Sequence, residues 1–222
     1  MGHHPLSRDL PVEPEAATLL FIDVQNFNTH RNGGEYVGMD PDEFTARFGY
    51  FFETIERETL PNMVRLQEAC RRRRIEVMYT VIENLTKDGR DRSLDYKITG
   101  FSVPRGSWDG KVFDAIRPEE DEIILPKTSS SVFISTQIDY VLRNLGTRYL
   151  IVSGFLTDQC VESAIRDACD LGYLVTMVTD ACATLSEERH GRTLATIKGY
   201  CRQVTTQEFL AELGESARDS QG

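Results

Sequence analysis

The segment that decides the fold is RYLIVSGFLTDQCVESAIRDACDLGY, residues 148–173. It opens with an apolar run, passes the turn residues Ser153 and Gly154, and continues into an amphipathic stretch that begins at Cys160. Apolar side chains recur in that stretch at the spacing of one helical face. The segment therefore predicts a buried strand, a turn, and a helix that starts at Cys160.

Cys160 is the first candidate for catalysis. A thiol in the first turn of a helix lies near unpaired backbone N–H groups and the positive end of the helix dipole, which favours the thiolate. Because the thiolate is the reactive form, we interpret Cys160 as a candidate nucleophile. The alternative is that it serves as a small hydrophobic residue of the core, as most cysteines do.

Two further apolar runs end on groups that complement a nucleophile. The run LLFIDVQN places Asp23 after a strand, and IILPKTSSSVF places Lys127 after another. A carboxylate near Cys160 would accept the thiol proton, an ammonium would stabilise the thiolate, and backbone N–H groups of the turn before Cys160 would stabilise an oxyanion. Taken singly, each residue also has a structural interpretation. Asp23 is then a loop or helix-capping carboxylate, and Lys127 is a solvated surface lysine.

Strand and helix patterns alternate along the chain. Strands are expected at 17–23, 75–82, 122–125, 148–152, 173–178 and, as a short edge strand, 203–205; helices are expected at 41–73 with a kink or break at Pro61, 135–145, 160–171, 187–198 and 207–213. The segment 83–108 is polar and has no clear period. This alternation predicts a three-layer α/β/α fold with a mainly parallel, Rossmann-like sheet, whose ligands bind at the carboxyl ends of the strands.

The organisation and composition limit the class of protein. We expect a flexible N-terminal arm over 1–16, one domain over 17–214 and a C-terminal tail over 215–222. Hydrophobic residues make up 40% of the chain and charged residues 27%, with a net charge of −10, which favours a globular protein and disfavours nucleic-acid binding. The basic run 71–74 falls at a helix end, where cations complement the dipole. No run of 18 apolar residues predicts a membrane span.

The cysteines and histidines bear on compartment and metal. Five cysteines are widely spread with no CxxC pair, which favours a reducing cytoplasm. His30 and His190 form no zinc pattern, and there is no GxGxxG, P-loop or GxSxG motif. We therefore expect no metal and no cofactor. The sequence leaves open whether His3 and His4 are native residues.

The motifs together point to a known family. On GFLTDQCVESAIRDACDLGY, VTDACAT and KTSSSVF, the chain resembles the isochorismatase-like cysteine hydrolases, which include nicotinamidases, N-carbamoylsarcosine amidases and ureidoacrylate amidohydrolases. The resemblance covers nearly the whole chain, from residue 19 to about residue 213. It implies the isochorismatase-like hydrolase fold, a cis peptide bond between Phe155 and Leu156, and an oxyanion hole made by the backbone N–H groups of Leu156 and Cys160. It also implies a catalytic triad of Asp23, Lys127 and Cys160.

Two features narrow the activity that the resemblance implies. True isochorismatases lack the nucleophilic cysteine, so Cys160 points to hydrolysis of a C–N bond. Nicotinamidases carry a metal-binding Asp-x-His motif where this chain has Ile82, Glu83 and Asn84. These features favour a metal-independent amidase acting on a small amide or N-carbamoyl (ureido) compound. The alternatives are an isochorismatase-type vinyl-ether hydrolase and a catalytically silent binding member of the fold.

The substrate-binding side chains and the assembly are further expectations. Residues just past the first two strands, and one in the polar segment, are candidates for substrate contact, each with a structural role as the alternative: Gln25, Asn26, Phe27, Glu83, Asn84 and Trp108. Family members commonly form dimers or tetramers, so the resemblance implies a homodimer or homotetramer.

Overall fold

The computed structural model describes residues 7–215. Their central feature is a six-stranded sheet with the order β3-β2-β1-β4-β5-β6, in which every neighbouring pair is parallel. The strands are β1 (Ala17–Ile22), β2 (Glu76–Ile82), β3 (Ile123–Lys127), β4 (Tyr149–Phe155), β5 (Leu174–Ala183) and β6 (Arg202–Val204). The predicted three-layer α/β/α fold with a parallel sheet is confirmed.

Alternating side chains of the strands explain why helices cover both faces of the sheet. In β1, Leu19 and Phe21 pack on one face, whereas Leu20 and Ile22 pack on the other. The same two-residue period continues through β2 and β4. Both faces are therefore apolar and each requires a helical layer.

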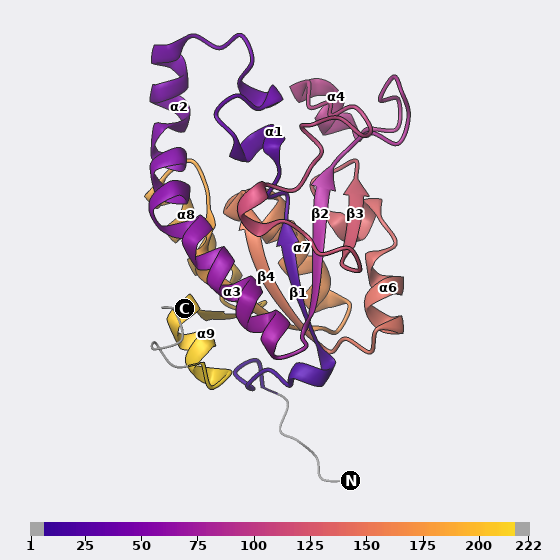
Figure 1. Ribbon diagram of the computed structural model, residues 1–222, viewed down its shortest axis with the longest axis vertical. Helices are drawn as coiled ribbons and strands as arrows, with labels where there is room; N and C mark the ends of the chain where they lie inside the picture. The colour runs from indigo at the N-terminus through magenta and orange to yellow at the C-terminus, as the bar shows by residue number, and fades with distance from the viewer. Residues whose placement is uncertain (1–6, 216–222) are drawn as a thin grey trace.

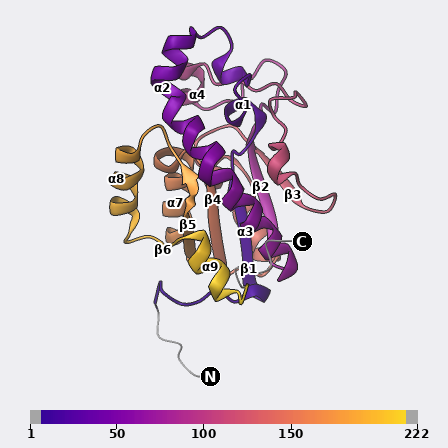
Figure 2. The same ribbon diagram turned by 60° about the vertical axis from the view of Figure 1, so that its left-hand side comes forward.

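Each face has its own set of helices. The first face is covered by α2 (Pro41–Thr54), α3 (Leu60–Arg72) and α9 (Thr206–Glu212). The second is covered by α5 (Val132–Ser135), α6 (Ile138–Asn144), α7 (Glu162–Asp170) and α8 (Glu187–Ile197). In Figure 1, α3 lies in front of the sheet and α7 behind it, and Figure 2 shows α7 and α8 on the side away from α3.

Short elements lie beyond the carboxyl ends of the strands. Figure 1 shows α1 (Asn26–Thr29) and α4 (Leu94–Thr99) above β1 and β2. The 3-10 turn Gly34–Tyr36 follows α1, and two further 3-10 turns are Pro14–Ala16 and Asp114–Ile116. The segment 83–108, which is polar and has no clear period, thus holds one helix, which begins where the Ser93 hydroxyl accepts a hydrogen bond from the Tyr96 N–H.

The helix predicted over 41–73 with a kink or break at Pro61 is indeed interrupted there. A π-helical turn, Ile55–Thr59, separates α2 from α3 just before Pro61, whose ring nitrogen has no N–H to donate to a preceding carbonyl. The predicted start of helix 135–145 was wrong: the backbone is extended at Thr136, so α5 ends at Ser135 and α6 begins at Ile138.

The predicted turn at Ser153 and Gly154 was also wrong, because both residues belong to β4. Ser153 is buried and its hydroxyl donates a hydrogen bond to the Ala181 carbonyl at 2.6 Å, so a polar residue is satisfied inside the sheet. Gly154 has φ of +139°, and a Cβ there would lie 2.2 Å from the carbonyl oxygen of Ile22. Glycine is therefore required by a close approach of β4 to β1.

The segments at both ends of the range 7–215 contact the rest of the domain. In the expected N-terminal arm, Val12 is buried and its N–H donates to Glu212. At the other end, Glu215 pairs with Arg72 and Arg73. His3 and His4 lie outside the described residues. Within residues 7–215, no helix is both long enough and apolar enough to cross a membrane.

Candidate active site

The sheet brings three chemically complementary side chains together. Asp23 follows β1, Lys127 is the last residue of β3, and Cys160 follows β4. The Lys127 Nζ lies 2.9 Å from Asp23 Oδ2 and 3.4 Å from Cys160 Sγ. All three are buried, with Asp23 and Lys127 exposed by no more than 1%. The carboxyl ends of parallel strands meet at one edge, which is why residues so distant in sequence converge.

Asp23 is held by the neighbouring strand β2. Its backbone N–H donates to the Thr80 carbonyl at 3.1 Å, and its Oδ1 accepts a hydrogen bond from the Thr80 hydroxyl at 3.0 Å. The backbone of Asp23 has φ of +56°, a left-handed conformation that is uncommon for a non-glycine residue and is often found at functional sites. Thr80 is thus an orienting residue for the carboxylate, and the sequence signal for it was a polar residue inside an apolar strand.

Lys127 has all three of its N–H donors engaged. Besides Cys160 Sγ, they reach the Tyr96 hydroxyl at 2.9 Å and the Ser129 carbonyl at 2.7 Å. Asp23 Oδ2 pairs with the same ammonium at 2.9 Å, and the Asp23 carboxylate also interacts with the Cys160 thiol. The buried carboxylate is therefore placed to exchange a proton with the thiol.

The electrostatics of the site act on the Cys160 thiol in opposite directions. Burial raises the pKa of Cys160 to about 12, and the negative charge of Asp23 adds to this, while the Lys127 ammonium opposes it. Burial would lower the pKa of Lys127, but the opposing effects, of which the negative charge of Asp23 is the largest, raise it. The site therefore favours a charged ammonium, and burial of the thiol favours its neutral form.

The turn that carries Cys160 differs from the predicted regular helix start. Residues Thr157–Val161 form a π-helical turn before α7 begins at Glu162. The peptide bond between Phe155 and Leu156 is cis, as the family resemblance implied. The Leu156 carbonyl accepts hydrogen bonds from the N–H groups of Gln159 and Val161, and none from Cys160 is found within the described chain.

A narrow cavity of about 30 Å³ lies beside the thiol. Its walls are mainly aromatic, and its lining includes Phe27, Tyr36, Phe48, Phe51, Phe101 and Phe155. Three further polar side chains line it with Asp23 and Cys160: Asn28, Glu35 and Gln159. Most of these residues come from α1, the 3-10 turn after it, α2 and the loop after α4.

Of the six predicted substrate-binding residues, Phe27 is the one that lines this cavity in the described part of the chain. Gln25 and Asn84 are buried and turned to structural partners: the Gln25 amide bonds both backbone groups of Ile82, and Asn84 donates to Ser102. A buried amide must satisfy its hydrogen bonds, and these partners hold both side chains away from the Cys160 cavity.

The remaining three predicted residues line a different cavity. Asn26, Glu83 and Trp108 border a space of about 590 Å³ on the β3 side of the sheet. The Asn26 amide donates to the Trp108 carbonyl, and Glu83 accepts from the Gly106 N–H, so these residues hold the 104–110 loop. The sequence missed Tyr96, Glu35 and Phe101, because their segments carry no periodic pattern. Phe48 and Phe51 lie in the predicted helix 41–73, whose pattern does not tell which of its residues border a cavity.

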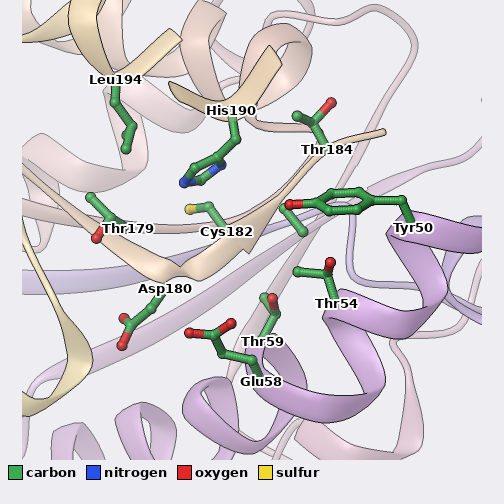
Figure 3. Close-up of a pocket in the computed structure, with 11 residues that line it drawn as sticks. Tyr50, Thr54, Glu58, Thr59, Thr179, Asp180, Cys182, Thr184, His190 and Leu194 are labelled. Carbon is green, nitrogen blue, oxygen red and sulfur yellow. The ribbon is translucent and has the colours of Figure 1, made fainter. Parts of the chain in front are cut away.

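A third cavity, lined by several polar side chains, lies at the end of β5, and Figure 3 shows its lining. It has a volume of about 200 Å³, and the His190 ring points into it from α8. The Nδ1 atom of His190 lies 3.0 Å from the Thr157 hydroxyl of the π-helical turn. His190 thus contacts the turn that carries Cys160 without lining the Cys160 cavity. No three His, Cys, Asp or Glu side chains form a metal-binding group among residues 7–215.

A comparison with known proteins identifies the family. The family model described as the isochorismatase domain matches residues 17–209. The chain therefore belongs to the isochorismatase family.

Individual curated proteins and solved structures are also similar to this chain. The ureidoacrylate amidohydrolase RutB of Rhizobium rhizogenes is 28% identical over 88% of this chain and 89% of its own length. The RutB protein of Caulobacter segnis is 27% identical over 94% and 90%. A cysteine hydrolase from Pseudomonas syringae pv. phaseolicola has a similar fold, with a TM-score of 0.77 and 24% identity over 96% of this chain and 99% of its own. The N-carbamoylsarcosine amidase of Thermoplasma acidophilum has a TM-score of 0.66 and 21% identity, over 86% and 96%.

Proposed function

We propose that this isochorismatase-family hydrolase is a metal-independent cysteine amidohydrolase that cleaves a C–N bond of a small amide or N-carbamoyl compound. The observation that carries the proposal is the buried contact between Cys160 Sγ and Lys127 Nζ, at 3.4 Å, with Asp23 Oδ2 2.9 Å from the same ammonium. The names of the relatives, ureidoacrylate amidohydrolase and N-carbamoylsarcosine amidase, support this class of substrate.

The first step is transfer of the thiol proton. Since the pKa of Cys160 is raised by burial, the nucleophile forms only when the proton moves to Asp23 as sulfur attacks the substrate carbon. The Asp23 carboxylate is suited to receive it, because it is buried beside the thiol and both groups contact the Lys127 ammonium. The Lys127 ammonium stabilises the negative charge that develops on sulfur.

The attack forms a C–S bond and places negative charge on the carbonyl oxygen. Backbone N–H groups of Leu156 and Cys160 are the proposed donors to this oxyanion. The π-helical turn supports this role for Cys160, because the hydrogen bonds to the Leu156 carbonyl come from the residues on either side of it. The thiol and the N–H group of Cys160 thus belong to one turn, which directly follows Leu156.

Collapse of the oxyanion breaks the C–N bond, and Asp23 returns the proton to the leaving ammonia or amine. Water then gives a proton to Asp23 and adds its oxygen to the thioester carbon, which releases the acid product. The proton on Asp23 returns to the Cys160 sulfur and restores the neutral thiol. Each proton gained by Asp23 is given back, so the cycle balances without a metal or an external reductant.

A screen for ammonia release tests the proposal. Purified protein is incubated with small primary amides and N-carbamoyl amines and acids, and ammonia is measured for the wild type and for Cys160→Ala. We expect turnover of at least one compound by the wild type and none above background by the variant, with circular dichroism unchanged. Turnover by Cys160→Ala would contradict the covalent mechanism, and silence of the wild type throughout the panel would favour a binding role.

A further inference from the structure

Glu35 lines the same cavity as Cys160 but has no part in the mechanism above. It lies in the 3-10 turn Gly34–Tyr36, which is held in place from two sides. The Gly34 N–H donates to Asp109, and a Cβ at Gly33 would lie 2.2 Å from the Phe27 carbonyl oxygen. The backbone before Glu35 is therefore closely packed, and this turn fixes where the carboxyl group enters the cavity.

No arginine lines the cavity with Glu35 in the described structure, and the triad lysine already has its donors engaged. Arg47 of α2 lowers the pKa of Glu35 through its charge, but it forms its ion pair with Glu43 on the surface. Burial raises the pKa of Glu35 to about 7, against the smaller opposing effects of a hydrogen bond with Tyr36 and of Arg47. The carboxyl group therefore faces the cavity without a cation of its own.

We propose that Glu35 is a specificity-determining residue that selects substrates whose end away from the scissile bond carries an uncharged N–H donor or a cationic amine, and rejects those that carry a carboxylate there. A carboxylate accepts hydrogen bonds from N–H groups and repels a second carboxylate in a poorly solvated site. The surrounding aromatic faces add favourable cation–π contacts for an amine. The inference rests on the proposed function and narrows its substrate class.

The inference separates this chain from its named relatives in one respect. Ureidoacrylate, the compound in the name of the RutB relatives, bears a carboxylate. A pocket that presents Glu35 and aromatic rings to the far end of the substrate is poorly matched to that group. We therefore expect a ureido or amide compound without an acid group to be the better substrate.

Charged thiol reagents test the charge preference without any turnover. Cys160 is labelled with methyl, 2-aminoethyl and 2-sulfonatoethyl methanethiosulfonate at about pH 8, where Glu35 is mainly ionised. Labelling at Cys160 is followed by peptide mass spectrometry, and each rate is divided by that for N-acetylcysteine. We expect the wild type to favour the cationic over the anionic reagent by about tenfold, and Glu35→Gln to lose most of that preference.

Matched variants make the outcome decisive. Glu35→Asp keeps the charge and should keep the preference, and Glu53→Gln, which removes an exposed charge on α2, should leave it unchanged. An equal rate for both charged reagents with the wild type, or an unchanged preference in Glu35→Gln, would overturn the proposal. Because labelling needs no substrate, this result stands apart from the ammonia screen. If turnover is found, Glu35→Gln should lower kcat/KM for amine-bearing amides and raise it for carboxylate-bearing ones.

Discussion

The strand ends and the loops above them contribute different parts of the candidate site. The ends of β1, β3 and β4 supply Asp23, Lys127 and Cys160, whose positions are fixed by the parallel register of the sheet. The loops and α2 supply the cavity walls and Glu35. In the proposed function, the reaction chemistry therefore depends on the sheet, whereas the choice of substrate depends on the loops.

The largest expected effect comes from removing the proton acceptor on the sheet side. Asp23→Asn keeps the shape of the side chain and should lower kcat/KM by about a thousandfold, because the neutral amide cannot take the thiol proton. The same variant should react faster with iodoacetamide, since the charge of Asp23 raises the pKa of Cys160. Slower alkylation together with the loss of activity would indicate a misplaced thiol instead of a lost base.

The next effect is on stability at the junction of β1 and β4. Gly154→Ala should lower the free energy of unfolding by about 3 kcal/mol, because its Cβ would lie 2.2 Å from the Ile22 carbonyl oxygen and the backbone is left-handed. Gly191→Ala is the control, since nothing lies within 4 Å of its Cβ, and it should be neutral or slightly stabilising. Urea unfolding of both variants measures the difference, and equal stabilities would refute the close approach.

The third prediction concerns pH. Because burial raises the pKa of Cys160 to about 12, the thiolate fraction should rise about tenfold for each pH unit between pH 7 and pH 10. The alkylation rate of the free enzyme at Cys160 should follow that rise and show no plateau below about pH 10. A plateau near neutral pH, measured by peptide mass spectrometry, would show instead that the resting thiol is ionised.

The smallest effects separate the two sets of loop residues. Phe27→Ala opens the wall of the Cys160 cavity and should change KM about tenfold. Trp108→Ala should change KM less than about twofold, because Trp108 is 47% exposed and borders the other cavity. Steady-state kinetics on any substrate found in the ammonia screen measures both, and equal effects would contradict the assignment of the cavities.

The sequence predicted the sheet side of the site far better than the loop side. Apolar runs with a helical pattern between them indicate parallel strands, and polar residues at their ends then share one edge, as Asp23 and Lys127 do. Even there, three features were not predicted: the rise that burial causes in the pKa of Cys160, the π-helical turn, and the extension of β4 through Gly154.

The cavity walls were not predictable because they depend on tertiary packing. The candidates for substrate contact were chosen because they lie close to strand ends in the sequence. Gln25 and Asn84, however, form hydrogen bonds with Ile82 and Ser102. The residues that do line the cavity, such as Glu35 and Phe101, come from segments without a period. Their position is decided by how those segments pack over the sheet, which no local pattern records.

Trapping the intermediate tests the central claim most directly. Wild-type protein is mixed with an accepted amide or N-carbamoyl compound, quenched with acid during turnover and digested with trypsin. Cys160 should carry the acyl or carbamoyl mass on the peptide 149–166, and Cys160→Ala should show neither turnover nor adduct. Sustained turnover without any adduct, with activity retained in Cys160→Ala, would contradict a buried cysteine nucleophile served by Asp23 and Lys127.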